Sequence, residues 1–390
     1  MRISKVQIAV VSVPFTVEER WAWGRRRGLT NVILQLHTDE GLVGLGEAVG
    51  APSGKLVAHT VEGFAPMVVG ENPFEIERIT RKLSHLSGLE HTRLASPAIC
   101  GIEMALWDIV GKACGQPLVN LFGGRVRDQI PFMFFLQRKP LDELAADAVA
   151  AVKRGFRTLY LKVGMDPRGD VEAVEAVRAA VGREPKIRLD ANEAWSPGTA
   201  LRMIQELSRF DLELMEQPVS GRNLEEMAYV RSRSPVPILS NEAAWNRFDV
   251  LTLIQRRAAD VISLECQMDN GLFNMKRTAG ICETAGLPVL KHTFGELGVS
   301  TAASLHVMAS TVNFLYANQS YVSCVVDDVI RGGPLPLEGE CLTVPEAPGI
   351  GVDLDEDRLK EGEERYRREG DFTLTDPEAA RSMTPSVPRF

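Results

Sequence analysis

The sequence predicts an α/β protein in which a (β/α)8 barrel follows an N-terminal α+β region. From residue 129 onward, short apolar runs alternate with amphipathic segments, which is the pattern of parallel strands joined by helical crossovers. Eight such runs can be placed, counting from QIPFMFFL (129–136). A closed barrel is the simplest sheet that accommodates eight parallel strands.

The first 125 residues have a different pattern. The segment NVILQLHTDEGLVGLGEAV reads as a hairpin, because two apolar runs flank the turn TDEG. The following SPAICGIEMALWDIVGKACGQPLVNLFGG has apolar residues at helical spacing and stops at two glycines. We therefore expect an α+β region at 1–125, the barrel at 126–328, and a segment at 329–390 that packs back on the first region. The charge run DEDRLKEGEERYRREG in that segment predicts a solvated helix.

Composition excludes several classes of protein. The chain of 390 residues can bury a large core, and its net charge of −8 argues against nucleic-acid binding. The first residues alternate like a strand and lack the features of a signal peptide, and no apolar run is long enough to span a membrane. The six scattered cysteines, without a C-x-x-C pair, suit reduced thiols. We expect a cytoplasmic protein.

A polar residue closes nearly every predicted barrel strand. The spacing between these residues, about 23 to 28 positions, is the length of one βα unit, so their side chains should share the C-terminal rim of the barrel. Any one of them could simply be solvated. The set is Lys162, Asp190, Glu216, Glu242, Glu265, His292 and Asn318.

Three consecutive strand ends carry carboxylates, namely Asp190, Glu216 and Glu242. Converging carboxylates repel one another unless a cation holds them, and three hard oxygen ligands suit Mg²⁺ rather than Zn²⁺. Lys162 and His292 stand on strands on either side of this set. A metal that holds a substrate carboxylate acidifies the α-proton and stabilises the enediolate, so Lys162 is best explained as a base abstracting that proton. Glu265 could accept a hydrogen bond from the His292 imidazole.

The motifs LKVG, LDAN, MEQP, NEAAW and KHTFGE together resemble the enolase superfamily, in its mandelate racemase-like branch, over nearly the whole chain. The resemblance implies a capping domain that closes over the barrel, Mg²⁺ on the three carboxylates, and Lys162 opposite a His292–Glu265 dyad. The chain departs from the family in having Tyr160 at the first lysine of K-x-K, glutamate rather than aspartate at 265, and Asn318 where a glutamate often ends the eighth strand. The muconate-lactonizing branch would carry lysine at 265 and Asp-Glu at 241–242, where this chain has Asn-Glu.

The substrate side is expected in FTVEERWAWGRRRGLT (15–30), where the family has a mobile specificity loop, and in the lid candidate GAPSG (50–54). An arginine there could clamp a second carboxylate or a polyhydroxy acid, although surface arginines and packed tryptophans would look alike. The apolar PFMFFLQ is mostly core but hints at a less polar pocket. The candidate substrate-binding residues are Tyr160, Asn192, Asn318, Trp21, Trp23, Arg25 and Glu296.

The resemblance implies Mg²⁺-dependent abstraction of a proton α to a carboxylate. We favour dehydration of an acid sugar to a 2-keto-3-deoxy acid. Racemisation, epimerisation or cycloisomerisation of a more apolar acid or lactone is the alternative, and a non-catalytic ligand-binding relative is a second. The expected partner is a small-molecule carboxylate substrate. We also expect the chain to form a symmetric homo-oligomer.

Overall fold

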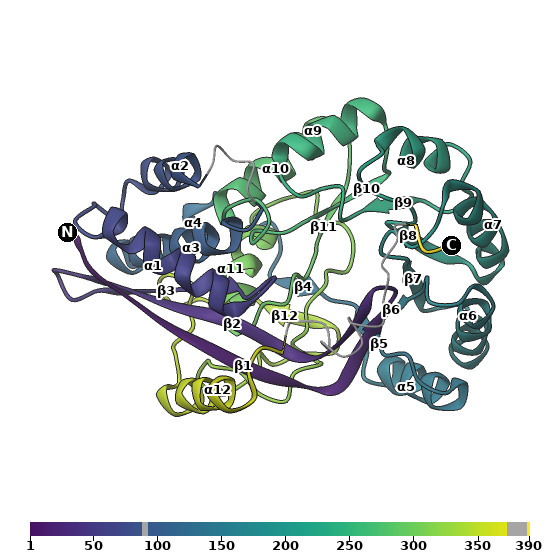
Figure 1. The fold of residues 1–390 in the computed structure, drawn as a ribbon, viewed down its shortest axis with the longest axis horizontal. Helices are drawn as coiled ribbons and strands as arrows, with labels where there is room; N and C mark the ends of the chain where they lie inside the picture. Colours follow the sequence, from purple (N-terminus) through teal and green to yellow (C-terminus); the bar gives the residue numbers. More distant parts are fainter. Residues whose placement is uncertain (88–92, 373–387) are drawn as a thin grey trace.

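The computed structural model describes residues 1–87, 93–372 and 388–390 (Figure 1). Its N-terminal region is an antiparallel sheet of β1 (Ile3–Trp21), β2 (Gly24–Thr38) and β3 (Val43–Val49), in that order. Three helices accompany it: α1 (Gly54–Val68), α2 (Ile76–Leu86) and α3 (Ser96–Cys114). Helix α3 packs closely on β3, because a Cβ at Gly46 would lie 1.9 Å from the carbonyl oxygen of Gly101.

The expected loop at 15–30 is instead the tip of a long hairpin. Strands β1 and β2 stay paired to the turn, with Glu19 opposite Arg26 and Trp21 opposite Gly24. Figure 1 shows the two strands reaching from the N-terminal sheet to the barrel strands β5 and β6. The tip therefore presents its side chains with the alternation of a strand.

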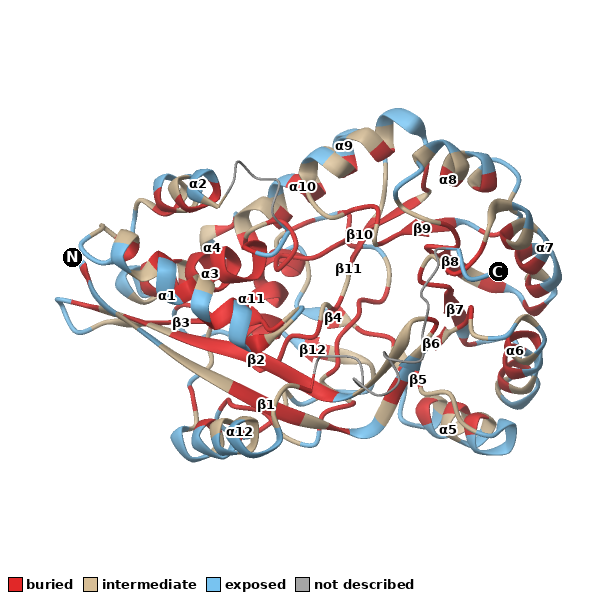
Figure 2. Ribbon diagram, in the orientation of Figure 1, coloured by how far each residue is buried: buried red, intermediate tan, exposed pale blue. Residues whose placement is uncertain are grey.

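The barrel sheet contains seven parallel strands in the order β11-β10-β9-β8-β7-β6-β5. The strands are β5 (Phe134–Leu136), β6 (Thr158–Lys162), β7 (Lys186–Asp190), β8 (Leu212–Glu216), β9 (Ile238–Ser240), β10 (Val261–Leu264) and β11 (Val289–Lys291). The helices around them mostly bury their inner faces and expose their outer ones, but the last of them is buried throughout (Figure 2). They are α5 (Leu141–Lys153), α6 (Pro167–Val181), α7 (Pro197–Leu207), η1 (Ser208–Phe210), α8 (Leu224–Arg231), α9 (Arg247–Arg256), α10 (Leu272–Thr284) and α11 (Gly298–Ala309), with the short α4 (Leu118–Leu121) before the barrel.

An extended segment at 313–319 closes the barrel. Its backbone hydrogen-bonds to β11 through Val289 and to the chain before β5 through Pro131 and Met133. The predicted first strand at 129–136 is divided, because β4 (Gln129–Pro131) pairs with β12 (Cys341–Thr343) and only β5 joins the barrel sheet. The prediction of a modified barrel with an N-terminal capping domain is otherwise confirmed.

The C-terminal segment carries α12 (Glu356–Glu369), which lies along β1 (Figure 1). Arg365 donates from Nη1 to the carbonyl oxygen of Ser12 at 2.9 Å. The expected segment 329–390 includes residues 373–387, which lie outside the described residues, and the boundaries at 125 and 328 stay predictions. Among the residues described, no helix has the length and apolar character needed to cross a bilayer.

Alternation along the strands directs side chains toward the barrel mouth. Leu214, Leu239, Val261 and Leu290 form a small apolar cluster on neighbouring strands. Two residues further along three of these strands stand Glu216, Asn241 and His292, whose side chains point the same way but nearer the C-terminal ends. The cluster is thus the floor beneath the polar layer of the mouth.

Two carboxylates of the N-terminal region cap helices of the barrel. Glu47 on β3 accepts hydrogen bonds from the backbone N–H groups of Leu297 and Ser300, at the start of α11. Glu103 on α3 accepts from Leu272 and Phe273, at the start of α10. Both carboxylates are buried and satisfy donors that a helix start leaves free.

Candidate active site

A cavity of about 210 Å³ opens at the C-terminal ends of the barrel strands, beneath the hairpin tip. Its polar wall includes Lys162, Asn192, Asn241, Glu242, His292 and Gln319. Its apolar wall includes Trp21, Phe135, Trp245, Met268 and Phe294. Ala51, in the predicted lid segment, also reaches the cavity. The structure therefore brings both predicted bases, Lys162 and His292, to one cavity.

Asp190 is fully buried at the end of β7 and accepts three hydrogen bonds. Lys162 Nζ lies 2.6 Å from its Oδ2 and the Tyr160 hydroxyl lies 2.5 Å from the same atom, while the backbone of Asn192 donates to Oδ1. Tyr160 and Lys162 are two residues apart on β6 and so face the same way. Tyr160 thus supplies an uncharged donor to Asp190 and does not line the cavity, contrary to its expected contact with substrate.

Glu216 and Glu242 lie at the ends of the next two strands after Asp190, and each accepts a hydrogen bond from a side-chain amide. Gln319 Nε2 lies 2.9 and 3.1 Å from the two carboxylate oxygens of Glu216, and Asn192 Nδ2 lies 2.8 Å from Glu242 Oε1. Burial, together with the charge of Asp190, raises the pKa of Glu216 to about 8 and that of Glu242 well above its usual value. The charge of Asp190 therefore disfavours ionisation of both glutamates.

The donor set fits a divalent cation. Three hard oxygen ligands come from the ends of adjacent strands, and Glu242 Oε2 and Asn192 Oδ1 are buried without a hydrogen-bond partner among the described residues. In the described part of the chain, no three potential ligands already enclose a point at metal-binding distance. The Lys162 ammonium is instead hydrogen-bonded to the Asp190 carboxylate, so it would have to move aside for Asp190 to bind an ion through that oxygen.

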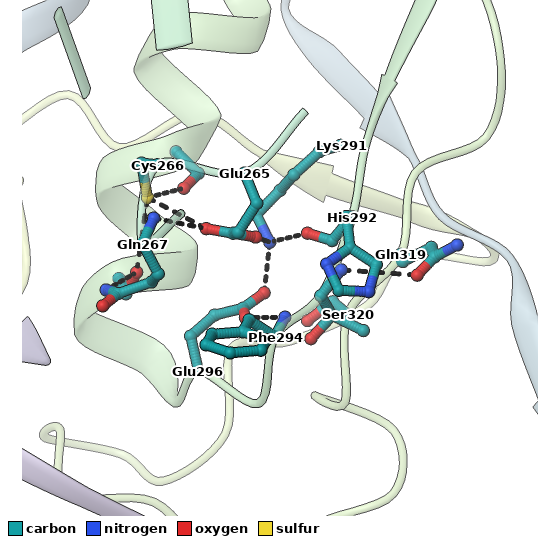
Figure 3. Close-up of polar contacts among 12 residues, drawn as sticks. Glu265, Cys266, Gln267, Lys291, His292, Phe294, Glu296, Gln319 and Ser320 are labelled. Atoms are coloured by element: carbon teal, nitrogen blue, oxygen red, sulfur yellow. Dashed lines mark hydrogen bonds and ion pairs between the residues drawn. The ribbon is translucent and has the colours of Figure 1, made fainter. Parts of the chain in front are cut away.

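The expected hydrogen bond between Glu265 and His292 is wrong (Figure 3). The Glu265 carboxylate accepts from Lys291 Nζ at 2.9 Å, and also from Cys266 Sγ and the Gln267 backbone. Lys291 pairs with Glu296 as well and donates to the carbonyl oxygen of His292 at 2.6 Å. The physical reason is that a fully buried ammonium requires partners, and the two acids supply them.

His292 points into the cavity with a neutral ring. Burial, followed by the charges of Lys291, Lys162 and Arg26, lowers its pKa well below the usual value. Its Nδ1 is buried and has no hydrogen-bond partner among the described residues. A neutral imidazole with an unpaired nitrogen can accept a proton. The Lys291 ammonium beneath it therefore helps to keep this form.

Besides Tyr160, four predicted substrate-binding residues lie outside the cavity lining. Trp23 donates from Nε1 to the Asn192 carbonyl oxygen at 2.5 Å, and Arg25 lies beside Glu18 on the exposed side of the hairpin. Asn318 closes the barrel, because its amide binds the Lys291 N–H and the Pro131 carbonyl oxygen. Glu296 forms a buried ion pair with Lys291.

Sequence reasoning missed a buried network on the cavity wall. Arg26 donates to Glu19 at 2.6 Å and to the Tyr321 hydroxyl at 2.5 Å, and Tyr321 donates to Glu19 at 2.7 Å. All three side chains line the cavity. The signal was the pairing of Glu19 with Arg26 in the hairpin, which becomes visible only when 15–30 is read as two strands. Gln319, which replaces Asn318 at the mouth, follows from the same alternation.

Comparison with known proteins covers nearly the whole chain. Residues 5–123 match the mandelate racemase / muconate lactonizing enzyme N-terminal domain, and residues 143–358 match the enolase C-terminal domain-like family. The chain is 32% identical to the hydrophobic dipeptide epimerase of Enterococcus faecalis, over 90% of this chain and 99% of that protein. It is 26% identical to the N-succinyl-L-Arg/Lys racemase of Bacillus cereus, over 93% and 98%. It is 28% identical to the arabinonate dehydratase of Saccharolobus solfataricus, over 83% and 88%.

Solved structures of related proteins also superpose on nearly the whole chain. An enolase from Streptomyces coelicolor superposes with a TM-score of 0.88 at 34% identity, covering 96% of this chain and all of that one. The Enterococcus faecalis dipeptide epimerase, solved with Mg and the dipeptide L-Leu-L-Tyr, superposes with a TM-score of 0.84 at 31% identity, covering 90% and 100%.

Proposed function

Because the chain belongs to the mandelate racemase / muconate lactonizing enzyme family of the enolase superfamily, we propose that it moves a proton at the carbon α to a substrate carboxylate. The observation that carries this proposal is the placement of two bases on one cavity. Lys162 ends β6 and His292 follows β11, which stand near opposite ends of the sheet order, and both side chains line the cavity. A substrate between them offers one face of its α-carbon to each base.

Asp190, Glu216 and Glu242 would hold Mg²⁺ at this site. When bound, the ion would stabilise the negative charge that develops on the substrate carboxylate as the α-proton leaves. Lys162 and His292 then do the proton transfer, one taking the proton and the other returning it to the opposite face. Gln319 and Asn192 orient the Glu216 and Glu242 carboxylates.

The reaction we propose is racemisation or epimerisation of a carboxylate with an apolar body. Trp21, Phe135, Trp245 and Phe294 make much of the cavity wall aromatic, which suits an apolar side chain better than a polyhydroxylated sugar. Arg26 adds a cation on the same wall, balanced by Glu19. A hydrogen-bond acceptor such as an amide oxygen suits this neutral pair. The likeness to a hydrophobic dipeptide epimerase supports this class of substrate, and the likeness to an N-succinyl-L-Arg/Lys racemase supports the type of reaction.

Dehydration of an acid sugar, which we favoured from the sequence alone, becomes the second candidate. His292 faces the cavity, where it could take the α-proton and then give a proton to a leaving β-hydroxyl. The likeness to arabinonate dehydratase supports this reaction. Cycloisomerisation stays a prediction as well, as do the mandelate racemase-like branch and the homo-oligomer.

The test is a screen in D₂O with Mg²⁺, followed by NMR, on pools of dipeptides, N-acyl amino acids, α-hydroxy acids, lactones and sugar acids. Deuterium at the α-carbon without net loss supports racemisation or epimerisation, whereas formation of a 2-keto-3-deoxy acid supports dehydration. Lys162→Ala and His292→Asn should each abolish conversion while the fold is kept. If both variants retain near-full rate, the assigned bases are wrong. Binding without exchange in any pool would favour the non-catalytic alternative.

A further inference from the structure

Arg389 and Phe390 lie against the loop that follows β7, although they are some two hundred residues away in sequence. The backbone N–H groups of both residues donate to the Ala194 carbonyl oxygen, at 2.8 and 3.0 Å. The Phe390 carbonyl oxygen accepts from the Ser196 N–H at 2.6 Å. Figure 1 shows the end of the chain beside β8 and α7. These two residues, called the strap below, are therefore hydrogen-bonded to the loop that carries Asn192.

The strap also holds the hairpin tip. Arg389 donates from Nη1 to the carbonyl oxygen of Ala22 at 2.5 Å, in the turn between β1 and β2. The next residue, Trp23, donates to the Asn192 carbonyl oxygen. The tip is thus tied to the β7–α7 loop twice, once directly through Trp23 and once through Arg389. The tip carries Trp21 and Arg26, which line the cavity.

The loop beneath the strap needs outside support. Asn192 and Glu193 have φ values of 42° and 65°, in the left-handed region that disfavours residues with a side chain. Asn192 binds Asp190 through its backbone and Glu242 through its side chain. A shift of this loop would therefore move the groups that orient two of the proposed metal ligands.

We propose that Arg389 and Phe390 are positioning residues, which hold the hairpin tip over the cavity and the β7–α7 loop against the metal-binding carboxylates. Apolar burial does not explain their placement, since the Phe390 side chain is 37% exposed. The contacts are instead directional hydrogen bonds to two elements that both line one cavity. The structural part of the proposal is independent of the reaction, and only its effect on turnover rests on the proposed function.

Limited proteolysis with chymotrypsin tests the structural part without a substrate. The tip offers Trp21 and Trp23 as cleavage sites, and cleavage of a folded chain follows the population of the locally open form. We expect Arg389→Met, and deletion of 388–390, to speed cleavage at the tip about tenfold or more, as loss of a hydrogen bond from a charged donor would do. The matched control is Arg233→Met, at an exposed arginine stacked on Tyr229.

Two results would overturn the proposal. Tip cleavage at the wild-type rate in both variants would mean that the strap does not hold the tip. Faster cleavage along the whole chain, with a melting temperature several degrees lower, would mean that the strap supports the fold in general. Faster cleavage at the tip alone, with the melting temperature kept, supports it.

A kinetic measurement tests the effect on the site. With a substrate found in the screen, both variants should raise KM by about fivefold or more while kcat falls less, because the open tip loses substrate contacts. An unchanged KM would overturn the positioning role. If the wild-type protein turns over no substrate, the proposed function fails, and the proteolysis still decides whether the strap holds the tip.

Discussion

Replacing Lys291 with methionine would remove a buried cation that two buried carboxylates share. The side chains of Lys291, Glu265 and Glu296 have no solvent exposure. Methionine keeps most of the aliphatic volume, so the change leaves little cavity and acts mainly through charge. The hydrogen bond from Nζ to the His292 carbonyl oxygen is lost as well.

The expected loss of stability is about 3–5 kcal/mol, the usual cost of removing one partner from a buried ion pair. That is a large fraction of the roughly 5–15 kcal/mol by which most domains are stable. The loss should also depend on pH. Burial raises the pKa of Glu265 to about 7 and Lys291 opposes that rise. Without Lys291 the folded chain should take up a proton at Glu265 more readily than the unfolded chain, so the variant should regain stability as the pH falls.

Urea unfolding followed by tryptophan fluorescence at pH 8 and pH 5.5 measures both quantities. The matched control is Lys276→Met, because Lys276 donates to Ser310 and Thr311 and makes no ion pair among the described residues. We expect the double variant Lys291→Met/Glu296→Gln to recover part of the loss. A deficit equal to the control's, or one that is the same at both pH values, would refute the ion-pair reasoning.

Three further predictions concern the barrel and its mouth. His306 is buried with a pKa lowered to about 4, by burial first, so the unfolded chain binds a proton between pH 6.5 and 4 that the folded chain does not. Stability should therefore fall by up to about 3 kcal/mol as the pH drops through that range, and His306→Gln should flatten the slope in urea titrations. Asn318→Leu should cost about 1–3 kcal/mol by leaving the Lys291 N–H unpaired, whereas Gln319→Leu should weaken Mg²⁺ binding measured by calorimetry; the reverse pattern would contradict their assignment. Mg²⁺ at a hundred times its Kd should add about 2.7 kcal/mol of stability to the wild type, and Glu242→Gln should remove most of that gain in thermal melts.

The length of the βα unit made the site largely predictable. A strand, a helix and two short loops take a similar number of residues each time, so the strand ends could be counted from the apolar runs alone. Lys162, Glu242 and His292 line one cavity for this reason, with Asp190 and Glu216 buried beside it. The closure of the barrel was harder to predict, because the segment at 313–319 pairs through isolated backbone bonds rather than a regular strand.

Two of the errors share one physical cause. Neighbouring residues of a strand face opposite sides, so an uncertainty of one position reverses an assignment. Arg26 lines the cavity where Arg25 was expected, and Gln319 where Asn318 was. His292 faces the cavity as predicted, but the partner of Glu265 is Lys291 rather than His292. A long-range contact such as that of Arg389 with Ala22 leaves no periodic signal, and only the folded chain reveals it.

The two carboxylates that cap α10 and α11 connect the N-terminal capping domain, the cover of the barrel, to the barrel itself. If residues 1–125 were removed, both helices would start with bare N–H groups, at a cost of about 1 kcal/mol each before the lost packing is counted. The N-terminal capping domain without the barrel would in turn expose Glu47 and Glu103 to solvent, although both are buried in the whole chain. Neither part should therefore be exchangeable between proteins as a cassette. A chimaera that joins this cover to a foreign barrel would keep its binding pocket only if the two helix starts came with it.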